Sequence, residues 1–160
     1  MAKFMMGELV GVEPISARLG AGSGSANRVD DKEHNKAVKL VAESGYNLAA
    51  VGDQIEGFIT AVETYTLDDF SMGSIQTKGR KTVTFDGLQG TPGTGTVAIG
   101  DYVVTGTPVA KGTALASASA VKVCKATTMT GMYFGWRVIS LGSAGTGAVG
   151  TVGVIERVNA

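Results

Sequence analysis

Short segments of this chain alternate apolar and polar residues, which is the pattern of β-strands that bury one face. The period is clearest at 38–43 and in 81–86, around Val83 and Phe85. Other segments are rich in β-branched and apolar residues without strict alternation, at 57–62, 102–105, 121–126, 134–141 and 149–158. We therefore predict roughly seven or eight strands.

One turn signature occurs twice. Gly52-Asp53 follows Ala50-Val51, and Gly100-Asp101 follows Ala98-Ile99, with the two Gly-Asp pairs 48 positions apart. Glycine allows the positive φ of a tight turn, and aspartate can bond the backbone beyond it, so both pairs are predicted as structural turns. The recurrence also raises the hypothesis of two related halves.

Further turns are predicted at Gly45-Tyr46-Asn47 and at Asp86-Gly87, where a strand should end. Helix signals are weak, because only 110–120 has the alanine content for a helix and it also contains glycine, threonine and serine. At most a short helix is expected. The fold class predicted from these patterns is all-β, as a compact antiparallel β-sandwich or a small β-barrel with an extended N-terminal arm.

We place the arm at residues 1–35 and the β-rich domain at residues 36–160. The arm contains Pro14, a linker-like Gly/Ser run at 20–25 and a polar run at 30–36. Its start is too apolar for a free tail. These residues either bind a partner or form an extra strand of the same domain, and the candidates are Phe4, Met5, Met6, Leu9, Val10, Val12 and Ile15.

Composition narrows the possible functions. The chain has 160 residues, enough for one compact domain, and its 24 glycines suit a fold with many corners. Fourteen basic and fourteen acidic residues balance, so direct binding of nucleic acid is not expected. No apolar stretch reaches the roughly 18 to 20 residues that span a bilayer, and no export signal is visible, so we expect no membrane association.

Groups able to do chemistry are scarce. Gly145 to Gly150 matches G-x-G-x-x-G, but a predicted strand follows it instead of a helix, so we interpret it as a loop. His34 is the only histidine and is expected to be solvated, whereas the only cysteine, Cys124, is expected to be buried as packing. One residue of each kind cannot build a zinc site, so neither a metal nor a cofactor is predicted.

Carboxylates and aromatic residues remain as candidates. Asp68-Asp69 and Asp30-Asp31 are the densest acidic clusters, and neither has calcium-loop spacing. The aromatic set at 133–136 could form a binding platform, but Phe134 and Trp136 share one strand face with Val138, which favours the core. No catalytic residue is predicted.

Four segments together resemble the capsid cement, or head decoration, proteins of tailed bacteriophages. They are Lys39-Leu40-Val41-Ala42, the stretch from Val51 to Ile59, the stretch from Ile99 to Val104, and Gly153-Val154-Ile155-Glu156. The resemblance covers residues 36 to 158. It implies a small β-rich protein that binds the outside of the capsid and holds neighbouring major capsid protein subunits together, with no catalytic residues.

The resemblance also implies the partners and the location. We expect the protein to be a homotrimer, with a dimer as the other option, on the outer surface of the virion after synthesis in the host cytoplasm. Two other classes of function are weighed against it. One is a β-sandwich carbohydrate- or receptor-binding module, which requires Trp136 and the tyrosines to be exposed in a groove. The other is a hydrolase that uses Asp68 or Asp69 in a cleft.

Overall fold

The computed structural model describes residues 14–20, 28–41, 45–63, 71–128 and 134–159, and all of its longer elements are strands. The all-β prediction is therefore confirmed. The strands are β1 (Pro14–Leu19), β2 (Ala37–Val41), β3 (Gly45–Leu48), β4 (Gly57–Glu63), β5 (Ser71–Gln76), β6 (Arg80–Leu88), β7 (Thr91–Pro92), β8 (Tyr102–Thr105), β9 (Lys122–Lys125), β10 (Phe134–Ser140) and β11 (Val152–Asn159). Two 3₁₀ turns, η1 (Asp31–Glu33) and η3 (Ala118–Ala120), are the helical elements in the described part of the chain.

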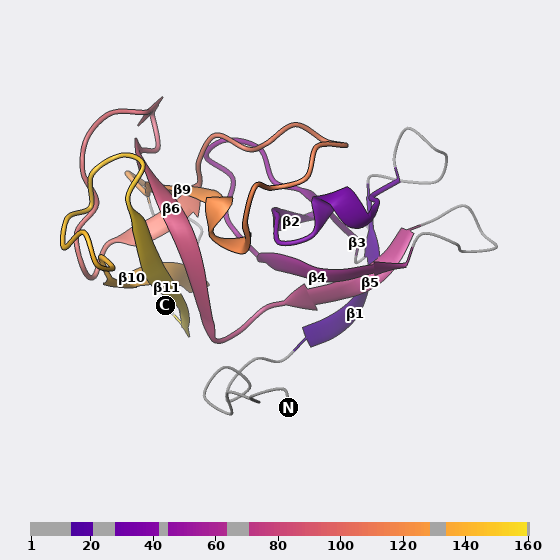
Figure 1. Ribbon diagram of the computed structural model, residues 1–160. Coiled ribbons are helices and arrows are strands. Elements are labelled where there is room, and N and C mark those ends of the chain that lie inside the picture. Colours follow the sequence, from indigo (N-terminus) through magenta and orange to yellow (C-terminus); the bar gives the residue numbers. More distant parts are fainter. Residues whose placement is uncertain (1–13, 21–27, 42–44, 64–70, 129–133, 160) are drawn as a thin grey trace, which may run out of the picture.

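The first five strands close into a small barrel in the order β1-β3-β2-β4-β5 (Figure 1). Every neighbouring pair is antiparallel except β1 and β3, which run parallel. Its core is a small aliphatic cluster made of Ala17, Leu19, Val29, Val38, Ile59 and Ile75.

The other six strands form a sheet in the order β11-β10-β8-β9-β6-β7, and an additional pairing of β11 with β6 closes this sheet as well. The result is a second five-stranded ring with the short β7 attached outside it. Its strands contribute two aromatic residues, Phe85 and Trp136, to a core that is otherwise rich in valines and isoleucines. In Figure 1 this second barrel lies on the left and the first barrel on the right.

The two barrels have the same topology. In each one, the first strand pairs with the third in parallel and with the fifth antiparallel, while the second lies between the third and the fourth. The register also agrees. Leu19 on β1 pairs with Tyr46 on β3, and Phe85 on β6 pairs with Val123 on β9. The hypothesis of two related halves therefore holds for the fold.

The agreement extends to irregular features. The pairing of the fourth and fifth strands shifts register between Ile59 and Ala61 in the first barrel and between Val138 and Ser140 in the second. The fifth strand of each barrel has a glycine at the equivalent position next to this shift, Gly73 in the first barrel and Gly153 in the second. These features recur because each sharply curved small barrel needs a bulge and a side-chain-free position to close.

The core cluster of the second barrel extends into the first half of the chain, where it includes Ala37, Ala49, Ile55 and Phe58. Phe58 on β4 belongs to the cluster of the second barrel, where its ring meets Trp136 edge to face at 5.0 Å between centroids. Arg157 on β11 also reaches back, with its guanidinium donating to the carbonyl oxygen of Glu56 and lying 3.9 Å from the Glu56 carboxylate. The contacts join the two barrels through their packed interior.

Several predicted boundaries are wrong. The described residues of 14–35 are not an irregular arm, because Pro14–Leu19 is the strand that closes the first barrel. Gly45–Leu48 is a strand rather than a turn, since its backbone pairs with both β1 and β2. Asp86-Gly87 does not end its strand. Gly87 takes a positive φ of 87° within β6, and the hairpin turn to β7 comes after Leu88.

Candidate functional site

The two Gly-Asp pairs form turns of the predicted kind. Gly52 and Gly100 have φ values of 80° and 91°, which only glycine adopts easily. Each aspartate bonds the first residue of its own turn rather than the backbone beyond it, with the carboxylate of Asp53 accepting from Ala50 N at 2.7 Å and that of Asp101 from Ala98 N at 2.8 Å. The backbone folds back because the glycine reverses its direction within the four residues.

Both turns dock on a strand residue in the same way. The N–H of Gly52 donates to the carbonyl of Thr105, whose own N–H donates to the carbonyl of Asp53, at 2.8 and 3.0 Å. Gly100 and Asp101 bond Val138 in the same manner, at 2.8 and 2.9 Å. Each aspartate also carries a lysine partner, Lys39 at 2.7 Å and Lys125 at 3.0 Å, respectively.

Two further turns share this geometry without the Gly-Asp signature. In Ala148–Thr151, Gly150 has a φ of 84°, and Gly150 and Thr151 bond Phe85 at 2.8 and 2.9 Å. In Glu33–Lys36, the third position is Asn35, with a φ of 67°, docked on Ile59. The barrel registers make the turn at Asn35 equivalent to the one at Gly100. The 48-residue spacing of the Gly-Asp pairs therefore does not mark the structural repeat.

The second residue of three of these turns is a branched aliphatic that faces solvent. The exposed fractions are 45% for Val51, 65% for Ile99 and 40% for Val149. Two of the turns are neighbours, because Thr96 forms a β-bridge with Ala148 and Val97 N donates to Gly147 O at 2.9 Å. Their loops lie side by side at the left end of the molecule in Figure 1.

A buried ion pair links the barrels at the turn that begins with Glu33. The Glu33 carboxylate lies 2.5 Å from the Lys36 ammonium, and both residues are buried. Lys36 also donates to Ala110 O at 2.9 Å, while Glu33 accepts from the N–H of Gly112. Since both charges are paired and bonded to a loop of the second barrel, we interpret them as a structural clamp.

A second buried carboxylate, Asp86, also has a partner for each of its two oxygens. Its oxygens accept from Thr107 N at 2.7 Å and lie 3.4 Å from the Lys122 ammonium. Burial acts to raise its pKa, but the hydrogen bonds from Thr107 and the charge of Lys122 outweigh burial, so the pKa lies below its usual value. Cys124 packs nearby, and burial raises the pKa of its thiol to about 11. The buried thiol agrees with the prediction for Cys124.

Lys81 carries an amine whose pKa is shifted by burial. It lies at the barrel junction, where its ammonium donates to the Asn35 side-chain oxygen at 2.5 Å and sits 5.4 Å from the centre of the Phe58 ring. Burial lowers its pKa to about 8. The amine packs against the junction rather than opening into a cavity lined by other reactive groups.

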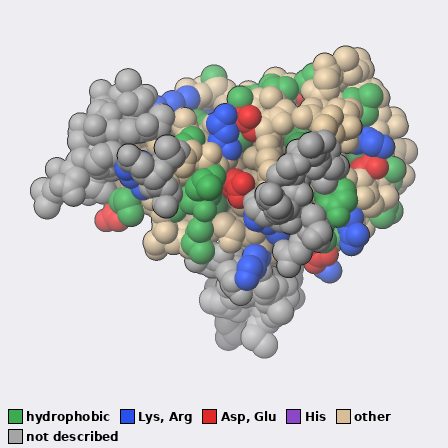
Figure 2. All heavy atoms as spheres, turned by 180° about the vertical axis from the view of Figure 1, so that it is seen from behind, with side chains coloured by type: hydrophobic (Ala, Val, Ile, Leu, Met, Phe, Trp, Pro, Cys, Tyr) green, Lys and Arg blue, Asp and Glu red, His purple; other side chains and the backbone are tan. Residues whose placement is uncertain are grey.

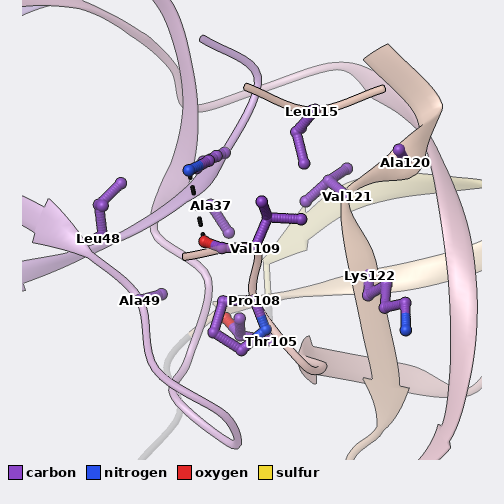
Figure 3. Close-up of a pocket in the computed structure, with 11 residues that line it drawn as sticks. Ala37, Leu48, Ala49, Thr105, Pro108, Val109, Leu115, Ala120, Val121 and Lys122 are labelled. Atoms are coloured by element: carbon purple, nitrogen blue, oxygen red, sulfur yellow. Dashed lines mark hydrogen bonds between the residues drawn. The ribbon is translucent and has the colours of Figure 1, made fainter. Parts of the chain in front are cut away.

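A cavity of about 30 Å³ lies between the barrels (Figure 3). Its lining is mainly aliphatic, with Leu48 and Ala49 on the side of the first barrel and Val109, Leu115 and Val121 on the side of the second. It has room for one or two water molecules. A sugar or a nucleotide would not fit without movement of the barrels.

The remaining sequence candidates are not brought together. His34 is exposed, and its ring bonds Thr60 O and the Asn35 side chain at 2.6 Å each. Asp30 caps η1 by accepting from Lys32 N at 2.9 Å. Trp136 and Val138 are buried in the core, as predicted. Ile15 is 39% exposed on β1. Gly145 to Gly150 is a loop followed by β11, as predicted.

Other candidates fall outside the described residues. They are Phe4, Met5, Met6, Leu9, Val10, Val12, Asp68, Asp69 and Tyr133, together with the side chain of Phe134. Within the described residues, no group of three or more histidine, cysteine, aspartate and glutamate side chains could hold a metal ion. No helix in the same ranges is long and apolar enough to cross a membrane.

Charges on the surface are mixed. Figure 2 shows lysine and arginine side chains interspersed with aspartate and glutamate on the face seen from behind. This distribution matches the balance of 14 basic and 14 acidic residues in the chain.

Searches against protein-family models, curated proteins and solved structures each find no match to this chain.

Proposed function

We propose that the protein is a structural capsid cement protein, which binds the outside of a phage head and stabilises contacts between major capsid protein subunits. In this proposal it catalyses no reaction and needs no cofactor. Its partners are the major capsid protein and copies of itself, as a trimer around a local three-fold position. It acts on the outer surface of the virion after synthesis in the host cytoplasm.

The observation that carries the proposal is a pair of barrels joined by packed contacts, whose solvent-facing turns present aliphatic side chains. Phe58 and Trp136 join the barrels through a shared core, and the pair of Glu33 and Lys36 adds a second link. A surface held in its binding shape loses little entropy when it docks. Modest contacts repeated over many copies then stabilise a shell through avidity.

The sequence resemblance gives separate support, because it connects the β-rich stretch from 36 to 158 with head decoration proteins. The burial of one residue argues against the carbohydrate- or receptor-binding alternative. It required Trp136 in an exposed groove, whereas this residue is completely buried in the core. We therefore do not propose that alternative.

The proposal is tested with heads that lack the protein. Purified protein is mixed with these heads, and the bound amount is measured by sedimentation and quantitative mass spectrometry. We expect saturable binding at many copies per head, together with higher resistance of the heads to heat. Heads that already carry the protein serve as the matched control and should bind none. No binding to bare heads, combined with absence from purified virions, would contradict the proposal.

A further inference from the structure

The outer faces of the two barrels differ at one pair of equivalent positions. In the first barrel, Thr60 and Ser74 lie on the outer face at the bulge between β4 and β5, and their hydroxyl groups share a hydrogen bond of 2.7 Å. The registers place Ile139 and Val154 at the same positions of the second barrel. A hydroxyl pair therefore satisfies the fold at this point, so folding does not explain why the second barrel carries two aliphatic residues there.

Two further valines extend this aliphatic pair along the same strand face. Ile155 on β11 is completely buried in the core, and alternate residues of a strand point to the same side. Val152, Val154 and Val158 therefore all lie on the outer face of β11, beside Ile139 of β10. Val152 is 41% exposed, and the other three are partly exposed. We call these four residues the aliphatic strip, which the strand geometry joins into one surface.

Charged side chains lie within and beside the strip. Glu156 is on the same face of β11, between Val154 and Val158, and its carboxylate lies 3.3 Å from the Arg80 guanidinium. Arg137 lies opposite Glu156 on β10 and is exposed. Because Glu156 already has Arg80 as a partner, Arg137 favours an occupant that brings an acidic group of its own.

The backbone of β11 limits how the strip can be covered. This strand pairs with β10 on one side and with β6 on the other, so it has no open edge. An occupant therefore binds through side chains and not by adding a strand to the sheet. It needs a row of apolar side chains on one face, with one acidic group among them.

The N-terminal segment, residues 1–13, has this pattern, although it lies outside the described residues. Its even-numbered positions from 4 to 12 hold the apolar residues Phe4, Met6, Val10 and Val12, with Glu8 in the middle. In an extended chain, alternate residues share one side. The segment therefore matches the strip in both apolar character and charge.

The segment also starts at the right place. Pro14 pairs with Gln76, whose side chain donates to the carbonyl of Arg80 at 2.9 Å, and Arg80 pairs with Glu156. Because β1 runs antiparallel to β5, the chain before Pro14 begins at the end where β5 continues into the second barrel (Figure 1). At roughly 3.3 Å per residue, residues 1–13 span about 43 Å, whereas β11 spans about 26 Å. The segment can therefore reach the whole strip.

We propose that the N-terminal segment covers the aliphatic strip of its own chain. The apolar side chains of its even-numbered positions pack on Ile139 and the three valines, and Glu8 lies beside Arg137. The contact removes apolar surface from water and ties the start of the first barrel to the side of the second. This inference goes beyond the cement function and does not depend on capsid binding.

The first test moves the polar pair of the first barrel into the second. The double variant Ile139→Thr with Val154→Ser should still fold, because this pair already occupies the equivalent positions of the first barrel. Limited chymotrypsin digestion of the full chain reports on cleavage after Phe4 and Leu9. We expect at least tenfold faster cleavage there in the double variant than in wild type. Leu40→Ser, at a residue of the first barrel that is 54% exposed, is the matched control and should be cleaved like wild type.

The second test locates the segment. A nitroxide attached at Gly7→Cys should broaden the methyl NMR signals of Ile139 and Val154 and leave those of Leu40 sharp, and the native Cys124 is buried. The broadening should persist when the labelled chains are diluted with unlabelled wild type, because the contact lies within one chain. Sharp signals for Ile139 and Val154 would overturn the inference, as would broadening that arises only between chains or equal cleavage rates in the first test. Binding to bare heads is measured separately and tests only the cement function.

Discussion

The two barrels have the same strand topology, but equivalent positions in them have different roles. Position 58 of the first barrel and position 137 of the second are equivalent by register, both pointing away from their own barrel on the fourth strand. Phe58 is completely buried against the second barrel, whereas Arg137 is exposed. The junction is therefore not repeated on the exposed side of the second barrel at Arg137.

Features that recur in both barrels are requirements of the fold. Features that differ between the barrels reflect other requirements, including functional ones. The strand order, the bulge on the fourth strand and the glycine on the fifth recur, so they belong to the fold. The side chains that fill the two cores differ. Trp136 occupies the position that Gly57 holds in the first barrel, where a side chain would meet Gln76 O and the Ile75 side chain at 2.5 Å. The second barrel thus has the larger core.

The largest effect is expected at the junction. Phe58→Ala should reduce the free energy of unfolding by about 3 to 5 kcal/mol, because it removes a buried ring that both barrels share. Arg137→Ala, at the equivalent exposed position, should change it by less than about 0.5 kcal/mol. Urea unfolding followed by Trp136 fluorescence and by circular dichroism measures both. Equal effects at the two positions would refute the asymmetry of the barrels.

The next effect concerns the shared glycines. A methyl group on Gly73 would lie 2.3 Å from Ala61 O and 2.6 Å from Leu19 Cδ1, and one on Gly153 would lie 2.3 Å from Phe85 Cζ and 2.5 Å from Ser140 O. Gly→Ala at either site should therefore cost about 1 to 3 kcal/mol, with the larger cost at Gly153 because the Phe85 ring cannot bend away.

The control for this pair is Gly90→Ala, since no atom lies within 4 Å of a methyl group there. Thermal unfolding of the three variants gives the ranking. A neutral result at both Gly73 and Gly153 would mean that the barrels do not need the close approach of their fourth and fifth strands.

A smaller effect is expected at the Gly-Asp turns. Asp53→Ala and Asp101→Ala each remove one backbone hydrogen bond and one partly exposed ion pair, and each should cost about 1 kcal/mol. Asp→Asn keeps an acceptor and removes the charge, so it should recover part of the loss. If one aspartate were indispensable and the other neutral, the two turns would not be structural equivalents.

The smallest effect is the pH dependence of Lys81, which lies at the junction and has no amine counterpart packed in the same way among the described residues. Its pKa is about 8 in the folded protein against 10.5 for the free side chain. Between these values the unfolded chain binds more protons, so the free energy of unfolding should rise with pH in this window. Lys81→Met should flatten the rise, whereas Lys32→Met, at an exposed site, should leave it unchanged. Parallel curves for Lys81→Met and wild type would contradict the burial of this amine.

Strands with strong side-chain patterns could be predicted from the sequence. Alternation revealed β2 and β6, and β-branched residues revealed β4, β8 and β9. Four strands were missed for a physical reason: β1, β3, β5 and the two-residue β7 contain proline, glycine, asparagine or serine, whose local preference is for turns and linkers. Backbone pairing with residues far along the chain overrides that preference, and no local pattern encodes such pairing.

Only part of the candidate surface could be predicted from the sequence. The turn chemistry of Gly52-Asp53 and Gly100-Asp101 was predictable, because positive φ and a carboxylate acceptor are local properties. The closeness of the turns at Ile99 and Val149 was not, since it depends on a bridge between Thr96 and Ala148. The burial of Glu33 and Lys36 was also hidden in a polar run, because their partners lie more than 70 residues away.

The most direct test of the central claim, that this protein acts by holding capsid subunits together, is cryo-electron microscopy of the phage head with and without it. We predict paired-barrel density on the outer surface, across the boundaries between major capsid protein subunits and at local three-fold positions. Identical maps with and without the protein would contradict the account, as would density confined to a single subunit.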